Sequence, residues 1–346
     1  MRKIVLKCGL VGFMALVLVA ILMVGVPTPA PAKQIVWKLD HMWAETDQEH
    51  IYLAQAANEI LEYTEGRLKI EIYPHFSLRL NPTTAYSNMR DGLTEIAAIF
   101  VQIAEGQEPS FAATEATGIW DSKAQVAKAV EALIPFKKKT YREVWGSHYL
   151  TTEYMTVQIS EIFSNTRELR TLDDFKGFKV RTPSARQQEI FKALGAAPQT
   201  MRLPDVYMGL KTGVVDGVSS SSRSSYTSKW HEVLKYATTL GVTEAGALDI
   251  VVSRKAWDAL PDDIKEVVNT VFEGVHQRSK AMAINPGISH HYRRVLDAKG
   301  MKYTDLSAAD LAKLKKVCWQ VHNDYIKTAT PRTLEAWKII KPIVEK

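Results

Sequence analysis

The fold is decided by residues 68–101, which read LKIEIYPHFSLRLNPTTAYSNMRDGLTEIAAIFV. Residues 68–72 alternate apolar and polar side chains, which predicts a strand with one buried face. Residues 96–101 are apolar throughout, as is typical of a strand that is buried on both faces of a parallel sheet. A helix is predicted around residues 84–90. The stretch is therefore interpreted as strand, helix and strand.

The residues that precede this stretch continue the same alternation. Residues 35–39 read IVWKL and predict a strand. An amphipathic helix follows, with apolar side chains at helical spacing from Ile51 to Leu61 and an end near Gly66. The order of elements becomes βαβαβ, which predicts an α/β fold with a parallel sheet and helices on its faces.

The middle of the chain repeats this order of elements. The predicted elements are strands at 157–163 and 178–181, a capping box at 171–174, and helices at 185–194 and 204–213. The last hundred residues are predicted to be largely helical. A long helix should end or kink there at Asn285-Pro286-Gly287, because proline cannot continue the hydrogen-bond ladder of a helix.

The first 32 residues have the features of a secretory signal. They carry Arg2, Lys3 and Lys7 and no acidic residue, followed by an apolar run over residues 8–26. A small-x-small site at residues 30–32 predicts cleavage before Lys33 and export to the periplasm. The alternative is an uncleaved membrane anchor, since the apolar run is long enough to span a bilayer.

Composition limits the function of the rest of the chain. The sequence has 44 Lys and Arg against 38 Asp and Glu, and three of the basic residues lie in the signal, so a net charge of +3 remains. No block of like charge is long enough to follow nucleic acid, and Lys137-Lys138-Lys139 is interpreted as a solvated helix end. Cys318 is the only cysteine after cleavage, which excludes an intramolecular disulfide. The length suggests two domains.

Three consecutive stretches carry the motifs of the chain: LDDFKGFKVRTP at 172–183, ALGAAP at 193–198 and PDVYMGLKTGVVDG at 204–217. Together they strongly resemble the DctP-type periplasmic binding proteins of TRAP transporters. Further matches at 63–67, 163–165 and 260–264 follow in the order of the family. Each match is weak alone, and the ordered set is specific.

The resemblance implies a two-domain α/β periplasmic binding protein with an interdomain cleft, crossing strands and a long C-terminal helix. By matching position, domain I comprises 33–157 plus 246–285, and domain II comprises 158–245 plus 286–346. Such proteins capture a small organic carboxylate and deliver it to a sodium-coupled TRAP permease in the membrane. They have no catalytic activity.

Arg181 is the main candidate for the ligand site. Its counterpart in the family forms a two-pronged salt bridge to the ligand carboxylate. A guanidinium suits this role because its planar fork matches a carboxylate and stays charged when it loses water. Arg181 also ends a predicted strand, where open α/β sheets bind ligands. Without the motif, an ordinary surface arginine would be the better interpretation.

Two positions depart from the family pattern. Ser220 stands where many members have an asparagine that also holds the carboxylate. Some members carry a second basic residue shortly before the Ser164-Asn165 pair, whereas residues 158–161 read QISE here and contain no arginine. These departures favour a ligand with a single carboxylate, with an aromatic ring or a hydroxyl group.

The remaining ligand candidates are apolar or aromatic side chains and one histidine. Trp43 and His41 follow the first predicted strand, and Phe100 ends another. Leu203 matches a family position that packs on the ligand. Such walls suit a ring or an aliphatic tail. For each residue the alternative is a structural role in the core, and His41 is the one candidate hydrogen-bond donor among them.

Other classes of function find little support in the sequence. It lacks the nucleophile elbow, the paired metal-ligand helix motif and the glycine-rich phosphate loops of common enzymes. His290 and His291 are adjacent and so point apart on a helix, and no metal site or cofactor is predicted. The nearest rival is a binding protein or a sensor module for another import or signalling system.

Overall fold

The computed structural model describes residues 33–345 apart from residues 79, 81–83, 155–157, 202 and 245. The predicted signal at 1–32, its cleavage before Lys33 and the first residue of the strand predicted at 157–163 lie outside the described residues. Within the described part of the chain, no helix combines the length and the apolar character needed to cross a membrane.

The first sheet confirms the predicted strands of the N-terminal region. Its strands, in spatial order, are β2 (Leu68–Tyr73), β1 (Ile35–Asp40), β3 (Ile96–Phe100), β10 (Ala247–Ser253) and β4 (Ser147–Tyr154). Strands β1 and β3 run parallel, as the order of elements predicted. Strand β10 lies between β3 and β4 and is antiparallel to both, so the sheet is mixed.

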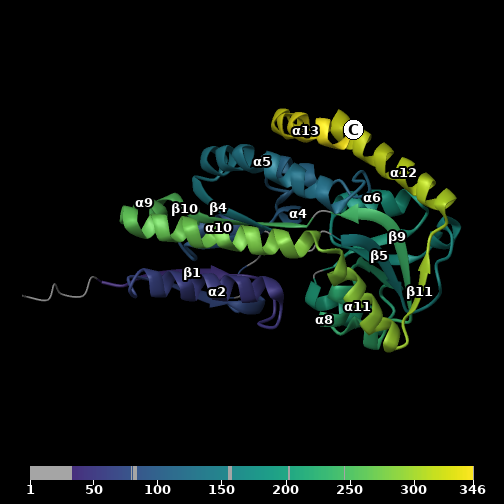
Figure 1. Ribbon diagram of the computed structural model, residues 1–346. Helices are drawn as coiled ribbons and strands as arrows, with labels where there is room; N and C mark the ends of the chain where they lie inside the picture. Colours follow the sequence, from purple (N-terminus) through teal and green to yellow (C-terminus); the bar gives the residue numbers. More distant parts are fainter. Residues whose placement is uncertain are drawn as a thin grey trace, which may run out of the picture. The chain divides into compact units, whose positions relative to one another are not determined.

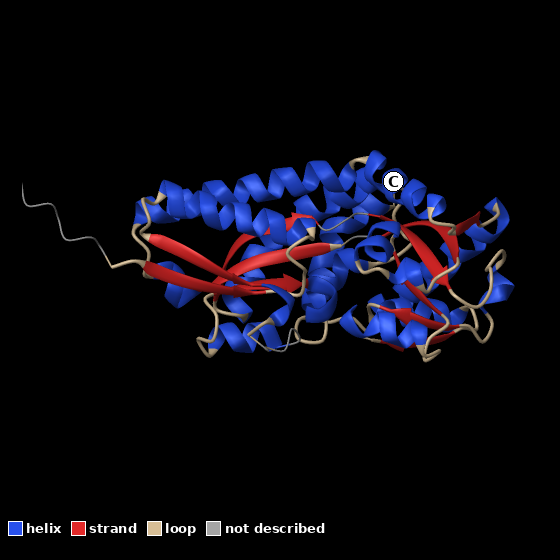
Figure 2. Ribbon diagram, turned by 90° about the horizontal axis from the view of Figure 1, so that it is seen from below, coloured by secondary structure: helices blue, strands red, loops and turns tan. Residues whose placement is uncertain are grey.

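The second sheet has six strands and is also mixed. Its strands, in spatial order, are β11 (Lys302–Asp305), β9 (Tyr236–Glu244), β5 (Gln158–Ser164), β8 (Gly217–Ser220), β6 (Lys179–Thr182) and β7 (Ala197–Thr200). Strand β6 is parallel to β7 and β8, and β5 is antiparallel to β8 and β9. Figure 2 shows the two sheets as separate groups of strands.

The helices surround the two sheets (Figure 1). Their bounds are α2 (Gln48–Tyr63), α3 (Ala85–Arg90), α4 (Val101–Ala104), α5 (Lys123–Val144), α6 (Ala185–Ala193), α7 (Val206–Lys211), α8 (Ser222–Thr227), α9 (Arg254–Asp258), α10 (Asp262–Ile284), α11 (Pro286–Ala298), α12 (Ala308–Lys327) and α13 (Pro331–Val344). The predicted helices of residues 51–65, 84–90 and 185–194 are confirmed by α2, α3 and α6. The capping box at 171–174 is also present.

The break predicted at Asn285-Pro286-Gly287 separates two helices. Helix α10 ends at Ile284, and α11 begins at Pro286 with Asn285 as its N-cap. The Asn285 side chain accepts a hydrogen bond from the Gly287 backbone N–H at 2.9 Å. The C-terminal region is therefore a series of helices, because proline at the first helical position starts a new helix where the previous one must stop.

The strands of each sheet come from two separate segments of the chain. Strands from 33–157 and 246–285 form the first sheet, and strands from 158–245 and 286–346 form the second. The last two helices pack in different hydrophobic core clusters. Cys318 of α12 packs in one core cluster with Phe178 and Val180 beside the second sheet. Trp337 of α13 packs in another with Val130 of α5, and α13 lies beside α5 in Figure 1. The exact domain limits stay a prediction.

Lys137 corrects one prediction. It was interpreted as part of a solvated helix end, but it lies inside α5 with a side chain that is 1% exposed. Its Nζ lies 2.9 Å from Oδ1 of Asp249 on β10, which is fully buried. Tyr141 and Thr152 also donate hydrogen bonds to Asp249. Charge runs are usually solvated, but Lys137 faces the same side of α5 as Leu133 and Tyr141, and that side faces the core.

Candidate ligand-binding site

The candidate residues lie where strands of the two sheets end. Trp43 follows β1, and Phe100 is the last residue of the parallel strand β3. Arg181 and Ser220 lie in the last half of β6 and β8, which are parallel neighbours in the second sheet. Ligands of α/β proteins bind outside the carboxyl ends of such strands. The candidates therefore lie at or just beyond strand ends, where the prediction expects ligand contacts.

Arg181 is a buried cation whose charge is not balanced within the described chain. The residue is 7% exposed, and its Nε donates to the carbonyl oxygen of Met201 at 3.0 Å. Burial lowers the pKa of the guanidinium to about 10, so it still carries its charge at neutral pH. No acidic side chain of the described residues forms an ion pair with it. A buried charge of this kind is costly unless an anion accompanies it.

Ser220 lies on the same face of the second sheet as Arg181. The parallel register places Arg181 beside Val218, and side chains two residues apart along a strand share a face. Ser220 is therefore one step further along that face, and Ser219 points to the opposite one. The Ser219 hydroxyl is buried without a hydrogen-bond partner, whereas Ser220 is half-buried. Arg181 and Ser220 therefore share one face of the sheet, and their role in ligand binding stays a prediction.

Glu161 lies opposite Ser220 on the antiparallel strand β5. Its carboxylate accepts hydrogen bonds from the Ser222 backbone N–H at 2.6 Å and from the Ser222 hydroxyl at 2.7 Å. Burial raises the pKa of the Glu161 carboxyl, and these hydrogen bonds oppose the rise. The position beside Ser220 is thus acidic. Among the described residues, the positive charge of Arg293 partly offsets the charge of Glu161.

His41 has no ring nitrogen left for a ligand. Its Nδ1 accepts a hydrogen bond from the Trp43 backbone N–H at 3.2 Å, and its Nε2 lies 3.1 Å from Nδ1 of His50. The sequence predicts that His41 donates a hydrogen bond to the ligand, but both of its ring nitrogens already have partners within the chain. The physical reason is local, because the turn after β1 uses the ring to hold its own backbone. His41 orients Trp43, whose ring lies 5.5 Å from its own.

The three apolar candidates differ in how far they are buried. Trp43 is 5% exposed and is part of the hydrophobic core. Phe100 is half-buried at the end of β3 and caps the start of α4. Leu203 starts a 3-10 turn and packs against the core cluster that holds Val206 and Leu210. Among the three apolar candidates, Phe100 has the side chain that is least engaged in core packing.

Two ion pairs connect the sides of the two sheets, and the sequence did not indicate either of them. Arg223 of α8 donates to both carboxylate oxygens of Glu49 on α2, at 2.8 and 2.6 Å. Arg186 of α6 lies 3.0 Å from Glu105, which follows α4. The partners are 174 and 81 residues apart in sequence. Such pairs follow only from the three-dimensional arrangement.

Glu153 lies near the first of these ion pairs. It ends β4 next to Tyr154, and it is 1% exposed. Neither of its carboxyl oxygens has a hydrogen-bond partner among the described residues. Burial, with the negative charge of Glu49, raises the pKa of Glu153 well above its usual range, although Arg223 opposes the rise. The folded chain therefore favours the neutral form of this acid.

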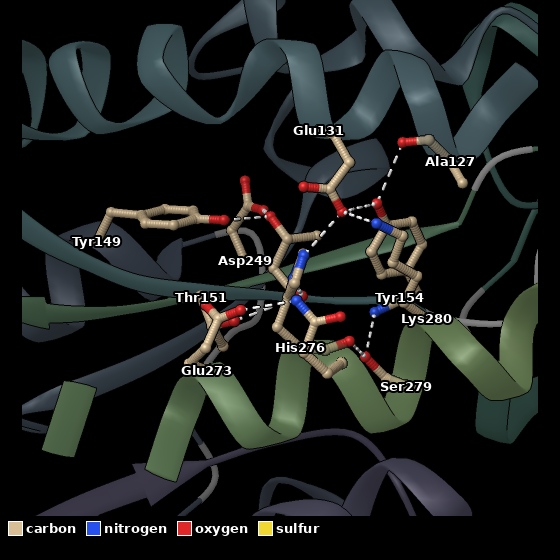
Figure 3. Close-up of polar contacts among 12 residues, drawn as sticks. Ala127, Glu131, Tyr149, Thr151, Tyr154, Asp249, Glu273, His276, Ser279 and Lys280 are labelled. Atoms are coloured by element: carbon tan, nitrogen blue, oxygen red, sulfur yellow. Dashed lines mark hydrogen bonds and ion pairs between the residues drawn. The ribbon is translucent and has the colours of Figure 1, made fainter. Parts of the chain in front are cut away.

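A polar cluster anchors the end of β4 directly before residues 155–157 (Figure 3). Glu131 of α5 accepts hydrogen bonds from the Tyr154 hydroxyl at 2.9 Å and from Lys280 Nζ at 2.7 Å, and it lies 2.8 Å from Nε2 of His276. Ser279 accepts the Tyr154 backbone N–H. Burial would raise the pKa of Glu131, but the three hydrogen bonds outweigh it and lower the pKa. The cluster joins α5, β4 and α10.

A known protein family matches most of the chain. Residues 39–328 match the DctP family, described as bacterial extracellular solute-binding protein, family 7. The chain belongs to this family. The match spans the residues that carry the motifs of the sequence, so the resemblance to DctP-type proteins is confirmed. Members of the family are solute-binding proteins, which confirms a binding function in place of an enzymatic one.

Individual relatives share about a quarter of their residues with the chain. The C4-dicarboxylate-binding periplasmic protein DctP of Rhodobacter capsulatus is 26% identical over 341 residues, covering 94% of this chain and 96% of its own length. The 2,3-diketo-L-gulonate-binding periplasmic protein YiaO of Escherichia coli is 24% identical over 243 residues, covering 69% of this chain and 73% of its own.

Solved structures show the same family fold. DctP6 of Bordetella pertussis, an extracytoplasmic solute receptor that binds pyroglutamic acid, has a TM-score of 0.81 at 20% identity and covers 89% of this chain and 99% of its own. A TRAP solute-binding protein of a marine metagenome in complex with 3-hydroxybenzoate has a TM-score of 0.76 at 20% identity, covering 90% and 98%. The two-sheet α/β architecture is therefore that of TRAP solute-binding proteins, as predicted.

Proposed function

We propose that the protein captures a small organic acid and holds one carboxylate of this ligand on Arg181. The observation that carries the proposal is the buried charge of Arg181 at the end of β6, which no acidic side chain of the described residues balances. Because Nε is already bonded to Met201, the two terminal nitrogens remain for the ligand. A carboxylate then binds end-on, with one oxygen on each terminal nitrogen.

Ser220 adds a neutral hydrogen bond to the same carboxylate or to a neighbouring hydroxyl group. This role follows from the position of Ser220 on the face of the sheet that carries Arg181. Phe100 of the first sheet and Leu203 of the second sheet's side provide apolar contacts, and Trp43 lies in the turn that follows β1. These assignments extend the predicted site, except that His41 serves the turn and not the ligand.

The ligand that best fits this charge pattern carries one carboxylate. Arg223 and Arg186 are each paired with an internal acid, and the position beside Ser220 is occupied by Glu161. Pyroglutamic acid and 3-hydroxybenzoate, each bound by one of the compared structures, are also acids with one carboxylate. The Rhodobacter relative is named for C4-dicarboxylates, so the relatives alone do not decide the number of carboxylates.

The bound acid is delivered to a membrane permease of the TRAP type, driven by sodium. The signal at 1–32 supports export to the periplasm, with cleavage before Lys33. The alternative is a binding or sensor protein of another import or signalling system, which the family match does not favour.

Native mass spectrometry of protein purified without unfolding tests the proposal. We expect a retained small acid, released by unfolding and identified by its exact mass. The Arg181→Ala variant, purified in parallel, should be free of it. A retained neutral sugar or a cation, present in both proteins, would contradict the proposal.

A further inference from the structure

The ion pair between Glu49 and Arg223 has the geometry of a bound carboxylate. The two terminal nitrogens of Arg223 each donate to one oxygen of Glu49, at 2.8 and 2.6 Å. This two-pronged arrangement is the one by which arginine recognises a ligand carboxylate. Both residues are buried, at 4% and 9% exposed. The guanidinium fork of Arg223 is thus filled by the protein itself.

The pair lies beside the proposed ligand residues in both halves of the molecule. Glu49 is in the first turn of α2, six residues after Trp43. Arg223 is in the first turn of α8, three residues after Ser220. Each partner therefore comes from the segment that directly follows a proposed ligand residue at the carboxyl edge of a sheet.

Arg181 and Arg223 differ in one respect that bears on specificity. Both are buried guanidinium groups near the same sheet edge. Arg223 has an internal carboxylate on its fork, and its charge is balanced. Arg181 has none among the described residues. Two arginines with open forks at this sheet edge would suit a ligand with two carboxylates, whereas one open fork suits a ligand with one.

We propose that Glu49 is a specificity-determining residue that occupies the place of a second ligand carboxylate. By filling the fork of Arg223, it restricts the site to acids with a single carboxylate. The inference deepens the proposed function, because it takes Arg181 as the anchor of the first carboxylate. The Glu49 side chain then determines how many ligand carboxylates the site accepts.

Removing the Glu49 carboxylate should create a new anion site. In Glu49→Ala, Arg223 remains buried without its counter-ion, and the missing side chain leaves room for a small carboxylate. An uncompensated buried charge is strongly destabilising, so an anion that enters is bound in proportion to the stability it restores. Glu153 is an internal competitor, since its carboxyl lies close enough for Arg223 to act on its charge.

The first experiment measures rescue by acetate. Thermal unfolding is followed with acetate and with chloride at equal ionic strength for the wild type, Glu49→Ala and Glu49→Gln. We expect acetate to raise the melting temperature of Glu49→Ala above its value in chloride. The wild type and the size-matched Glu49→Gln should respond less than Glu49→Ala, because their side chains fill the space at Arg223 and leave acetate only the site at Arg181. Adding Glu153→Gln to Glu49→Ala removes the competitor and should enlarge the response.

The second experiment measures the change of specificity. Succinate, glutarate and adipate, which differ in the spacing of their carboxylates, are titrated by calorimetry into the wild type and Glu49→Ala. We expect at least one of them to bind Glu49→Ala about tenfold or more tightly than the wild type. The gain should disappear when Arg181→Ala is added.

Three outcomes would overturn the inference. The first is an equal acetate response in all variants, and the second is no gain in affinity of Glu49→Ala for any of the dicarboxylates. The third is a Glu49→Ala protein that no carboxylate returns to the folded state, while the double variant Glu49→Gln/Arg223→Gln, which lacks both charges, folds. The excess of the Glu49→Ala response over that of the wild type does not involve Arg181, which is unchanged in both. A failure of the anchor on Arg181 would therefore leave that response intact, and the two failures are distinguishable.

Discussion

The Nε atom of Arg181 on β6 lies 3.0 Å from the carbonyl oxygen of Met201, the first residue after β7. This bond fixes the orientation of the guanidinium before any ligand arrives. Preorganisation of this kind lowers the entropy cost of binding, because the charged group does not need to be ordered by the ligand. The chain itself thus positions the terminal nitrogens of Arg181.

Ser220→Ala should weaken ligand binding only slightly. One neutral hydrogen bond is worth about 1 kcal/mol, which corresponds to about fivefold in the dissociation constant. Ser220→Asn should broaden recognition toward the ligands of members that carry asparagine there. Calorimetry with the co-purified acid measures both effects. A loss as large as that of Arg181→Ala would mean that the carboxylate is held mainly by β8.

Lys137→Met should strongly destabilise the fold. The change leaves Asp249 buried with hydrogen bonds from Tyr141 and Thr152 but without its counter-ion. Breaking a buried pair costs about 3–5 kcal/mol. Urea unfolding followed by circular dichroism measures the loss. Lys138→Met, on the neighbouring residue of the same helix, is the control and should cost much less. Equal losses would show that the ion pair is not the cause.

Asp40→Asn should change how stability depends on pH. Asp40 borders a cavity of about 20 Å³ together with Asn88 and Thr94, and no side chain of the described residues donates a hydrogen bond to its carboxyl. Burial raises the pKa of Asp40 from 3.8 to about 6, although the Leu78 backbone opposes the rise. A raised pKa favours the protonated folded state, so the wild type loses stability as pH rises from 3.8 to about 6.

The asparagine variant cannot ionise and lacks this loss. Its stability relative to the wild type should rise by up to about 3 kcal/mol between pH 3.5 and pH 7. Urea unfolding at a series of pH values measures the difference. Asp91→Asn, on the exposed surface, is the control for general charge effects. A difference between Asp40→Asn and the wild type that stays constant with pH would show that Asp40 ionises normally.

Local sequence patterns predicted most elements that have their own periodicity or caps. The alternation in residues 68–72 and the capping box at 171–174 act over a few residues, and both are present. Helix α8 was missed, because a run of serines has no apolar period. Its start is fixed by Ser221, whose hydroxyl accepts the Ser224 backbone N–H. The insertion of β10 between β3 and β4 was missed as well, since strand order is a long-range property.

The site was predictable only as far as its motif reached. Arg181 and Ser220 follow from residues 172–217, and the register of β6 and β8 places them on one face. The ring partners of His41 lie two and nine residues further along the chain, in the turn after β1 and in α2, yet nothing in the sequence indicates which ring nitrogen each one engages. Pairs such as Glu49 and Arg223 join segments 174 residues apart, and no local pattern encodes them.

Arg186→Gln should shift the molecule toward a more open arrangement of its two sheets. Arg186 pairs with Glu105 at 3.0 Å, and its guanidinium lies 3.8 Å from the centre of the Tyr325 ring. Without these contacts, fewer interactions oppose opening. Small-angle scattering of the ligand-free protein should give a larger radius of gyration for Arg186→Gln. The control is Lys192→Gln, which removes an exposed pair within the same helix.

Addition of the ligand should contract both the wild type and the Arg186→Gln variant, because a ligand that touches both sides stabilises the closed state. Scattering that stays unchanged at saturating ligand, with binding confirmed by calorimetry, would replace closure by a rigid preformed pocket.

Calorimetric titration of the co-purified acid into the wild type, Arg181→Ala and Arg181→Lys tests the central claim most directly. Two charge-assisted hydrogen bonds are each worth about 1.5–3 kcal/mol, so Arg181→Ala should bind about a hundredfold or more weakly. Arg181→Lys should fail nearly as badly, because an ammonium group cannot form the two parallel bonds. Binding by Arg181→Ala within about threefold of the wild type, which is under 1 kcal/mol, would contradict the claim that Arg181 anchors the ligand.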